Sequence, residues 1–386
     1  MALNTVSSER LSTNVKTTNL NSSFGQLGGR NMVINGSMQV NQRGDQTGIT
    51  SHQYGLDRWK LLNTSLGAYS ISQLTNSDNE INTGHRFSAK VDCTTADASP
   101  AAGDLLIFQT TLEGLVTNRL CWGTSNAKKA VLSFWAKAEI NGFSSGTKDF
   151  VLEIQTSDSQ EFSVVCQLAA NNTWQKFTVP IDAKTSGSVV NDNQAAASIN
   201  WWLDAGTNYK GGTGVTGWAA KGNSGGVRAA GQTLALGAHT DNNFYLTGVQ
   251  FEIADPNTTA TEFEHRSFGE ELSLCQRYFY KIVGQDSDMA AFGFNYSSSD
   301  HYFNIEFPVP MRDYPTYTGT TTDARIFANN IGQDFTLNSL SIVGNMTSSN
   351  PNRVTLHVNQ GGATAGEGGL LSIQNTEGSL SFSADF

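Results

Sequence analysis

Aromatic residues gather beside an acidic residue in the middle of the chain. Trp201 and Trp202 are adjacent, and Asp204 follows them closely. Tyr209 and Trp218 come later in the same region. Sugar rings pack their C–H faces on indole and phenol rings, while carboxylates accept hydrogen bonds from sugar hydroxyls. These five residues are therefore the predicted ligand-binding group, and the predicted ligand is a glycan. The alternative is that the same aromatics fill a long loop or a subunit interface.

Acidic side chains are the next candidates, because paired carboxylates cleave polysaccharides in glycosidases. Asp204 lies beside the two tryptophans, and Asp97 and Asp104 lie near each other in the sequence. Nothing in the sequence places two carboxylates at the separation that this chemistry needs. The repeats of a β-helical depolymerase are also missing. No catalytic residue is predicted, the chain is expected not to be an enzyme, and a depolymerase remains the less favoured alternative.

Two glycine-rich segments match catalytic or cofactor motifs only in part. Residues 222–226 resemble the nucleophile loop of chymotrypsin-like proteases, but none of the 6 histidines shows the signature of a base held by an acid. Residues 212–217 fit G-x-G-x-x-G without a strand before or a helix after them. Both belong to a glycine-rich loop over residues 206–237, and no cofactor is predicted.

The cysteines argue against metal or redox chemistry. They are widely spaced and form no C-x-x-C pair, so we expect buried free thiols made in a reducing cytosol. The four residues are Cys93, Cys121, Cys166 and Cys275. No metal ligand is predicted.

Charge and hydropathy exclude two classes of partner. The net charge of -10 argues against binding nucleic acid through its phosphates. Apolar runs fall short of the roughly 20 residues that span a bilayer. Residues 1–21 lack the basic start and apolar segment of a signal peptide. We therefore expect neither a nucleic-acid partner nor membrane insertion.

Short segments with strand-like patterns follow one another from residue 31 to residue 253. Residues 86–91 and 131–137 alternate polar and apolar side chains, and turn pairs such as Asn141-Gly142 separate the segments. The run 32–34 is interpreted as the first short strand. Many short strands without amphipathic helices predict a two-sheet antiparallel sandwich. Adjacent strand residues point to opposite faces, so one of the two adjacent tryptophans should lie in the core and the other on the opposite surface.

One helix is predicted after the sandwich. Ser267 and Glu270 fit a capping box, with Ser267 as the N-cap. An apolar stripe at helical spacing follows: Leu272, Cys275, Phe279 and Ile282. Strand-like segments then return over residues 303–309, 335–343, 353–358 and 370–382.

The chain therefore divides into three predicted parts. Residues 1–28 are polar and lack core-forming side chains, which favours an arm that orders against another subunit. A floppy terminus is the alternative. Residues 29–265 form the sandwich, and residues 266–386 form a short helix and a smaller C-terminal β domain.

Several segments, in this order, resemble a module common in bacteriophage tail and fibre proteins. The opening segment, residues 31–44, is followed by Asp57-Arg58-Trp59. Other segments look like the central strands, closing strand, junction and C-terminal unit of that family: residues 132–137, 172–177, 244–252, 260–279, 307–312, 315–316 and 382–385.

The resemblance implies a jelly-roll sandwich like those of carbohydrate-binding modules, in a homo-oligomeric virion appendage that is usually a trimer. We thus expect an all-β, antiparallel jelly-roll chain that acts as a tail-fibre subunit binding a host-surface polysaccharide. Residues 1–28 would join other tail or capsid proteins, and the virion would assemble in the host cytoplasm. A purely architectural protein that decorates the capsid or tail is the alternative.

The family also raises the question of calcium. Carbohydrate-binding relatives often hold a structural calcium with acidic residues near the opening and closing strands. Here those places carry Ser37 and the pair Thr247-Gly248. Because calcium prefers several oxygen ligands that include carboxylates, we do not expect a calcium ion there.

Overall fold

The computed structural model describes most of the chain after its first residues. The described ranges are 29–77, 83–215, 217–221, 228–254, 259–284, 288–318, 324–328, 333–336, 339–342, 351–373 and 379–386. The predicted arm, residues 1–28, lies outside them.

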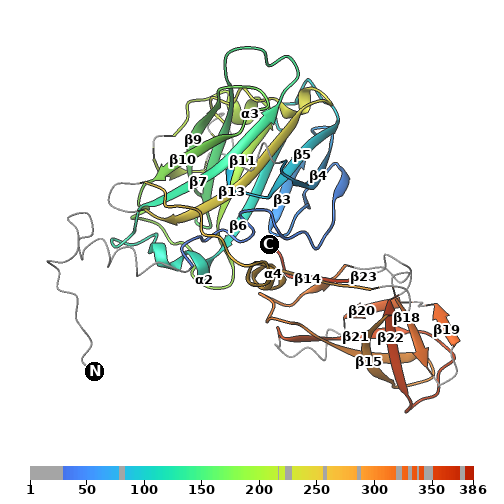
Figure 1. Cartoon of the computed structure of the whole chain (residues 1–386). Helices are drawn as coiled ribbons and strands as arrows, with labels where there is room; N and C mark the ends of the chain where they lie inside the picture. Colours follow the sequence, from blue (N-terminus) through green and yellow to red (C-terminus); the bar gives the residue numbers. More distant parts are fainter. Residues whose placement is uncertain are drawn as a thin grey trace, which may run out of the picture.

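Two antiparallel sheets form the larger part of the molecule, as the alternating segments predicted (Figure 1). The first sheet has the order β1 (Gln46–Ile49), β4 (Ala68–Thr75), β5 (Phe87–Thr95), β13 (Asn243–Ile253), β7 (Ala130–Glu139) and β10 (Gln175–Ile181). The second has the order β12 (Ala219–Ala220), β9 (Gln160–Leu168), β8 (Lys148–Thr156), β11 (Ala195–Ala205), β6 (Leu105–Glu113), β3 (Trp59–Thr64) and β2 (Gln53–Tyr54). Short helical turns lie between strands: α2 (Gly114–Thr117), η3 (Asn118–Leu120), α3 (Thr207–Lys210) and η4 (Leu236–Ala238).

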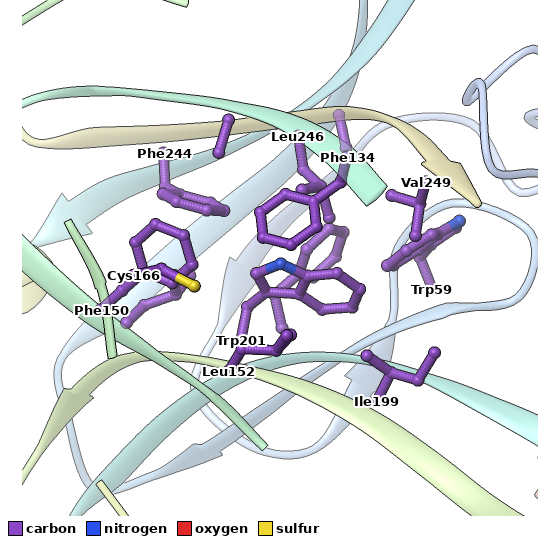
Figure 2. Close-up of a cluster of buried hydrophobic side chains, with 14 of the residues drawn as sticks. Trp59, Phe134, Phe150, Leu152, Cys166, Ile199, Trp201, Phe244, Leu246 and Val249 are labelled. Carbon is purple, nitrogen blue, oxygen red and sulfur yellow. The ribbon is translucent and has the colours of Figure 1, made fainter. Parts of the chain in front are cut away.

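Aromatic side chains fill the space between these two sheets (Figure 2). The ring centroids of Trp201 and Trp59 lie 5.5 Å apart, and Phe134 meets Trp201 edge-on at 5.5 Å. Such rings bury large apolar areas and add favourable edge-to-face contacts. The inward-facing residues of both sheets thus share one core, as expected for a jelly-roll sandwich.

The C-terminal part has two further sheets and its own core, separate from the first. The smaller sheet has the order β14 (Phe279–Val283), β23 (Ser379–Ser383) and β17 (Thr316–Tyr317). The larger has the order β19 (Gln333–Thr336), β18 (Ala324–Ala328), β22 (Gly368–Ile373), β15 (Met289–Asn295), β16 (Asp300–Glu306), β21 (Arg353–Asn359) and β20 (Ser339–Ile342). The all-β class is confirmed, while the exact domain limits at residues 29–265 and 266–386 stay a prediction.

The predicted helix is present, but it is shorter than its apolar stripe. Helix α4 (Phe268–Gln276) has Ser267 as its N-cap, and the Ser267 hydroxyl oxygen accepts the N–H of Glu270. It lies where the two parts meet (Figure 1). The expectation that Phe279 and Ile282 continue the helix is wrong. Both lie in β14, because the backbone of residues 279–283 pairs with β23.

The apolar run 32–34 is also not a strand. It leads into a turn, and both Met32 and Val33 are buried. The N–H of Met32 donates to the carbonyl oxygen of Phe251 on β13. The run is apolar because it closes one end of the core, and a single backbone bond to β13 anchors it there.

All four cysteines are free. Cys93, Cys166 and Cys275 are buried, whereas Cys121 is half-buried. Burial raises the pKa of the Cys166 thiol to about 12, so this sulfur stays protonated and behaves as a small apolar group.

Candidate glycan-binding site

The two adjacent tryptophans lie on opposite faces of β11, as the strand period predicted. Trp201 points into the core between the sheets, and Trp202 points to the outer face of the second sheet. Both side chains have 0% exposure. The expectation that one of them is exposed is therefore wrong. The ring of Tyr209 lies 5.2 Å from that of Trp202, and the Arg228 guanidinium lies 4.8 Å above the same indole.

A buried carboxylate, which the sequence did not single out, holds this covered indole in place. Glu153 on β8 has 0% exposure and accepts hydrogen bonds from Trp202 Nε1 and Asn200 Nδ2, each at 2.9 Å. Arg228 adds two charge-assisted bonds at 2.7 and 2.9 Å. The outer face around Trp202 is thus a closed, hydrogen-bonded structural cluster.

Asp204 is also buried. Its carboxylate accepts the N–H groups of Gly237 at 3.0 Å and Ala205 at 2.8 Å, and Lys210 lies 3.9 Å away. Burial is the main cause that raises the pKa of Asp204 to about 6. The residue therefore helps to fix the chain after β11.

The raised pKa of Asp204 predicts a pH dependence of stability. The folded-state pKa of Asp204, about 6, exceeds the ordinary 3.8. In the pH window between these two values the folded state holds a proton that the unfolded state has lost. Stability falls as the pH rises through the window, by about 3 kcal/mol from this group. Asp204→Asn keeps an acceptor oxygen but cannot ionise. In urea unfolding across this pH range, we expect the wild type to lose about 3 kcal/mol relative to the variant. Parallel pH profiles would contradict this.

The other acidic candidates, Asp97 and Asp104, bond to the backbone. Asp97 Oδ1 accepts the N–H of Ser99 at 3.0 Å, and Asp104 Oδ2 accepts the N–H of Ala101 at 2.8 Å. Each carboxylate thus satisfies the backbone of its own turn.

Trp218 lies apart from the Trp202 cluster. Its ring meets Trp122 edge-on at 5.0 Å and lies 5.7 Å from Phe162, and its Nε1 donates to the carbonyl oxygen of Asp182. It packs against the main core. Trp202 and Tyr209 are therefore brought together, whereas Trp201 and Trp218 serve the core. Glycan binding by the five residues stays a prediction.

A second set of aromatic residues is exposed, on the larger C-terminal sheet. Phe292 and Phe294 on β15 are 70% and 51% exposed, and Tyr296, two residues further, is 69% exposed. Alternate residues of a strand share one face. Three large rings in this arrangement form an apolar surface that solvent reaches.

The neighbouring strands complete this surface. Tyr302 on β16 lies opposite Phe294, and its ring lies 5.9 Å from the rings of both Phe294 and Tyr296. His357 on β21 stacks on Tyr302 at 5.1 Å. We call the group Phe292, Phe294, Tyr296 and Tyr302 the aromatic face.

Polar groups border the aromatic face at its His357 side. His357 Nε2 lies 3.0 Å from Asp300 Oδ1, and Asn359 Nδ2 donates to the same oxygen at 3.4 Å. Hydrogen bonds from Ser297 and His357 lower the pKa of Asp300, so this carboxylate is ionised at neutral pH and accepts hydrogen bonds. Rings beside a carboxylate, an amide and an imidazole match the two kinds of contact that a sugar makes.

The sequence contains a signal for this face that the strand prediction missed. Residues 292–296 alternate aromatic and small or polar side chains, which is strand periodicity. Sequence reasoning started the C-terminal strands at residue 303. Apolar alternation normally marks the buried face, and here it marks the exposed one.

The described ranges hold no group of three His, Cys, Asp or Glu side chains placed to bind a metal ion. Thr247 Oγ1 donates to the carbonyl oxygen of Phe87 at 2.6 Å. No helix within the described part of the chain has the length and apolar character to cross a bilayer.

No protein-family model and no curated protein sequence matches the chain. Among solved structures it is similar to a CBM4 module at 14% identity, covering 57% of this chain and 97% of the module, with a TM-score of 0.27. A family 11 carbohydrate-binding module from Clostridium thermocellum, in complex with a β-1,3-1,4-mixed-linked tetrasaccharide, matches at 11% identity over 54% of this chain and 95% of its own, with a TM-score of 0.25. A CBM22-1–CBM22-2 tandem domain from Paenibacillus barcinonensis matches at 9% identity over 92% of this chain and 90% of its own, with a TM-score of 0.27. At identities and TM-scores this low, function has to be inferred from the chain's own residues.

Proposed function

We propose that this chain is a non-enzymatic receptor-binding subunit that recognises a cell-surface glycan with its aromatic face. The observation that carries the proposal is the exposure of Phe292 and Phe294 on β15 and of Tyr296 just beyond its end. Leaving three such rings in water is unfavourable, so a surface of this kind marks a binding site.

The chemistry around the rings favours a sugar. A pyranose would lay its C–H face on Phe294 and Tyr296, where the rings offer apolar area. Its hydroxyls would reach Asp300, His357 and Asn359 at the border of the face. Aromatic side chains lose little conformational entropy on binding, which suits weak contacts that are repeated in an oligomer.

The biological setting is proposed on the sequence resemblance. Residues 31–44, 57–59 and 260–279 resemble a module of bacteriophage tail and fibre proteins. The protein is accordingly a homotrimeric tail-fibre or appendage subunit, assembled in the host cytoplasm and carried on the virion. Residues 1–28 attach it to other tail or capsid proteins, and three copies of the aromatic face bind one host surface with avidity.

A glycan array tests the binding proposal. We expect the wild-type protein to bind bacterial surface glycans on the array. The double variant Phe294→Ala/Tyr296→Ala should bind the same glycans at least about tenfold more weakly. Phe268→Ala removes an exposed ring from α4 and is the matched control, with binding unchanged. Both variants should unfold at the wild-type temperature, because the removed rings are exposed.

The same proteins separate the proposal from its alternatives. An architectural role predicts that no glycan is retained. If the aromatic face were an interface between copies, the double variant would dissociate in sedimentation velocity. A depolymerase would release reducing ends from the retained polysaccharide. Each of these results would overturn the proposal.

A further inference from the structure

A pocket of about 410 Å³ lies where the sandwich meets the C-terminal part. One wall comes from the start of the sandwich and includes Tyr54 on β2 and Lys60 on β3. The other comes from β14, β23 and the residue after β17, and includes Lys281. The volume falls within the range of ~300–1,000 Å³ that is typical of small-molecule sites.

The charge of this junction pocket is opposite to that of the whole chain. Arg43, Lys60, Lys281 and His52 line it, and no Asp or Glu of the described residues does. The chain as a whole carries a net charge of -10. A recess lined by one sign of charge concentrates ions of the other sign.

The cationic side chains of the pocket differ in the partners that they have within the protein. Arg43 is paired with Asp385 and lies 3.7 Å above the ring of Phe279. Lys60 donates to the main-chain oxygen of Phe386 at 3.2 Å. Lys281 is half-buried in β14, and its ammonium makes no hydrogen bond or ion pair with any described residue. An incoming anion could therefore pair with Lys281 without breaking an existing bond of this ammonium.

Neutral polar groups line the rest of the pocket. Gln53, Thr318 and Ser381 present amide and hydroxyl groups there. Gln53 Nε2 donates to Gln46 Oε1 at 2.9 Å, and Thr318 Oγ1 donates to the carbonyl oxygen of Ser381 at 3.3 Å. The side-chain oxygens of Gln53 and Thr318 can still accept hydrogen bonds, which sugar hydroxyls can donate and a bare inorganic anion cannot.

We infer that the junction pocket binds the carboxylate of an acidic sugar, a hexuronic acid unit, with Lys281 and Lys60 holding the carboxylate. The ring hydroxyls bond to Gln53, Thr318 and Ser381. This site is separate from the aromatic face and does not depend on the function proposed for it.

Calorimetric titration of the full chain with tetragalacturonate tests the inference. The fully methyl-esterified tetramer, which has the same rings without charge, is the matched ligand control, and sodium sulfate is the bare-anion control. We expect tetragalacturonate to bind, the ester to bind about tenfold more weakly, and added salt to weaken the charged ligand alone. Sulfate should bind more weakly than tetragalacturonate.

Two lysine variants test whether tetragalacturonate binds in the junction pocket. Lys281→Gln should weaken tetragalacturonate binding about tenfold at an unchanged melting temperature, because the Lys281 ammonium bonds to no described residue. Lys176→Gln removes an exposed lysine from β10 and should bind as the wild type does. The variant Phe294→Ala/Tyr296→Ala should also bind tetragalacturonate normally, so failure at one site is distinguishable from failure at the other. No binding of tetragalacturonate, equal binding of the ester or of sulfate, or wild-type binding by Lys281→Gln would overturn the inference.

Discussion

Replacing Arg58 by alanine is expected to lower the free energy of unfolding by roughly 3–5 kcal/mol. Arg58 Nη1 lies 3.0 Å from Asp385 Oδ1, and the two side chains are only 2% and 5% exposed. The same guanidinium donates to the carbonyl oxygen of Thr111 and lies 3.5 Å above the ring of Tyr278. Its removal leaves a buried carboxylate and carbonyl short of a donor, and leaves a void against Tyr278. Urea denaturation measures the change.

The controls for Arg58 separate this cluster from a general charge effect. Arg353→Ala removes an exposed arginine from β21 and should change stability little. Asp385→Ala should destabilise less when Arg58 is already alanine, because the two residues share one buried network. Arg58 belongs to the sandwich and Asp385 to the C-terminal part, so their ion pair joins the two. If Arg58→Ala unfolded at the same urea concentration as Arg353→Ala, this ion pair would not stabilise the chain.

Replacing Glu153 by alanine is expected to cost roughly 3–5 kcal/mol as well. The change leaves the Arg228 guanidinium without its two bonds and the indole N–H of Trp202 without an acceptor. Buried donors that lose their partner carry the full cost of desolvation. Circular dichroism during urea unfolding measures the loss, and Glu153→Gln, which keeps an acceptor oxygen, should lose less.

Glu306→Ala is the matched control for this prediction. Glu306 lies exposed on β16, so its removal should leave stability near that of the wild type. Wild-type stability of Glu153→Ala would mean that the cover over Trp202 is not a structural cluster.

Local patterns in the sequence predicted the elements well. Alternation predicted the antiparallel strands, and the pair Ser267 and Glu270 predicted where α4 begins. The two-residue period of a strand also placed Trp201 and Trp202 on opposite faces. These inferences succeeded because each depends on residues close together in the chain. The predicted end of α4 was wrong, because residues 279–283 form β14 and pair with β23, about a hundred residues later in the chain.

The site was harder to predict because its contacts join distant residues. Arg228 lies 75 residues from Glu153, and only the folded chain shows that it covers Trp202. The junction pocket likewise combines Lys60 with Lys281. The aromatic face has a local signal, but alternation does not say which side of a strand faces solvent until the partner elements are known.

A crystal structure of the chain with a glycan selected on the array tests the binding proposal most directly. We predict an intact sugar ring packed on Phe294 and Tyr296, with a hydroxyl donating to Asp300. The proposal would be contradicted by a sugar bound elsewhere with the aromatic face bare, by a cleaved product, or by a second copy of the chain covering these rings.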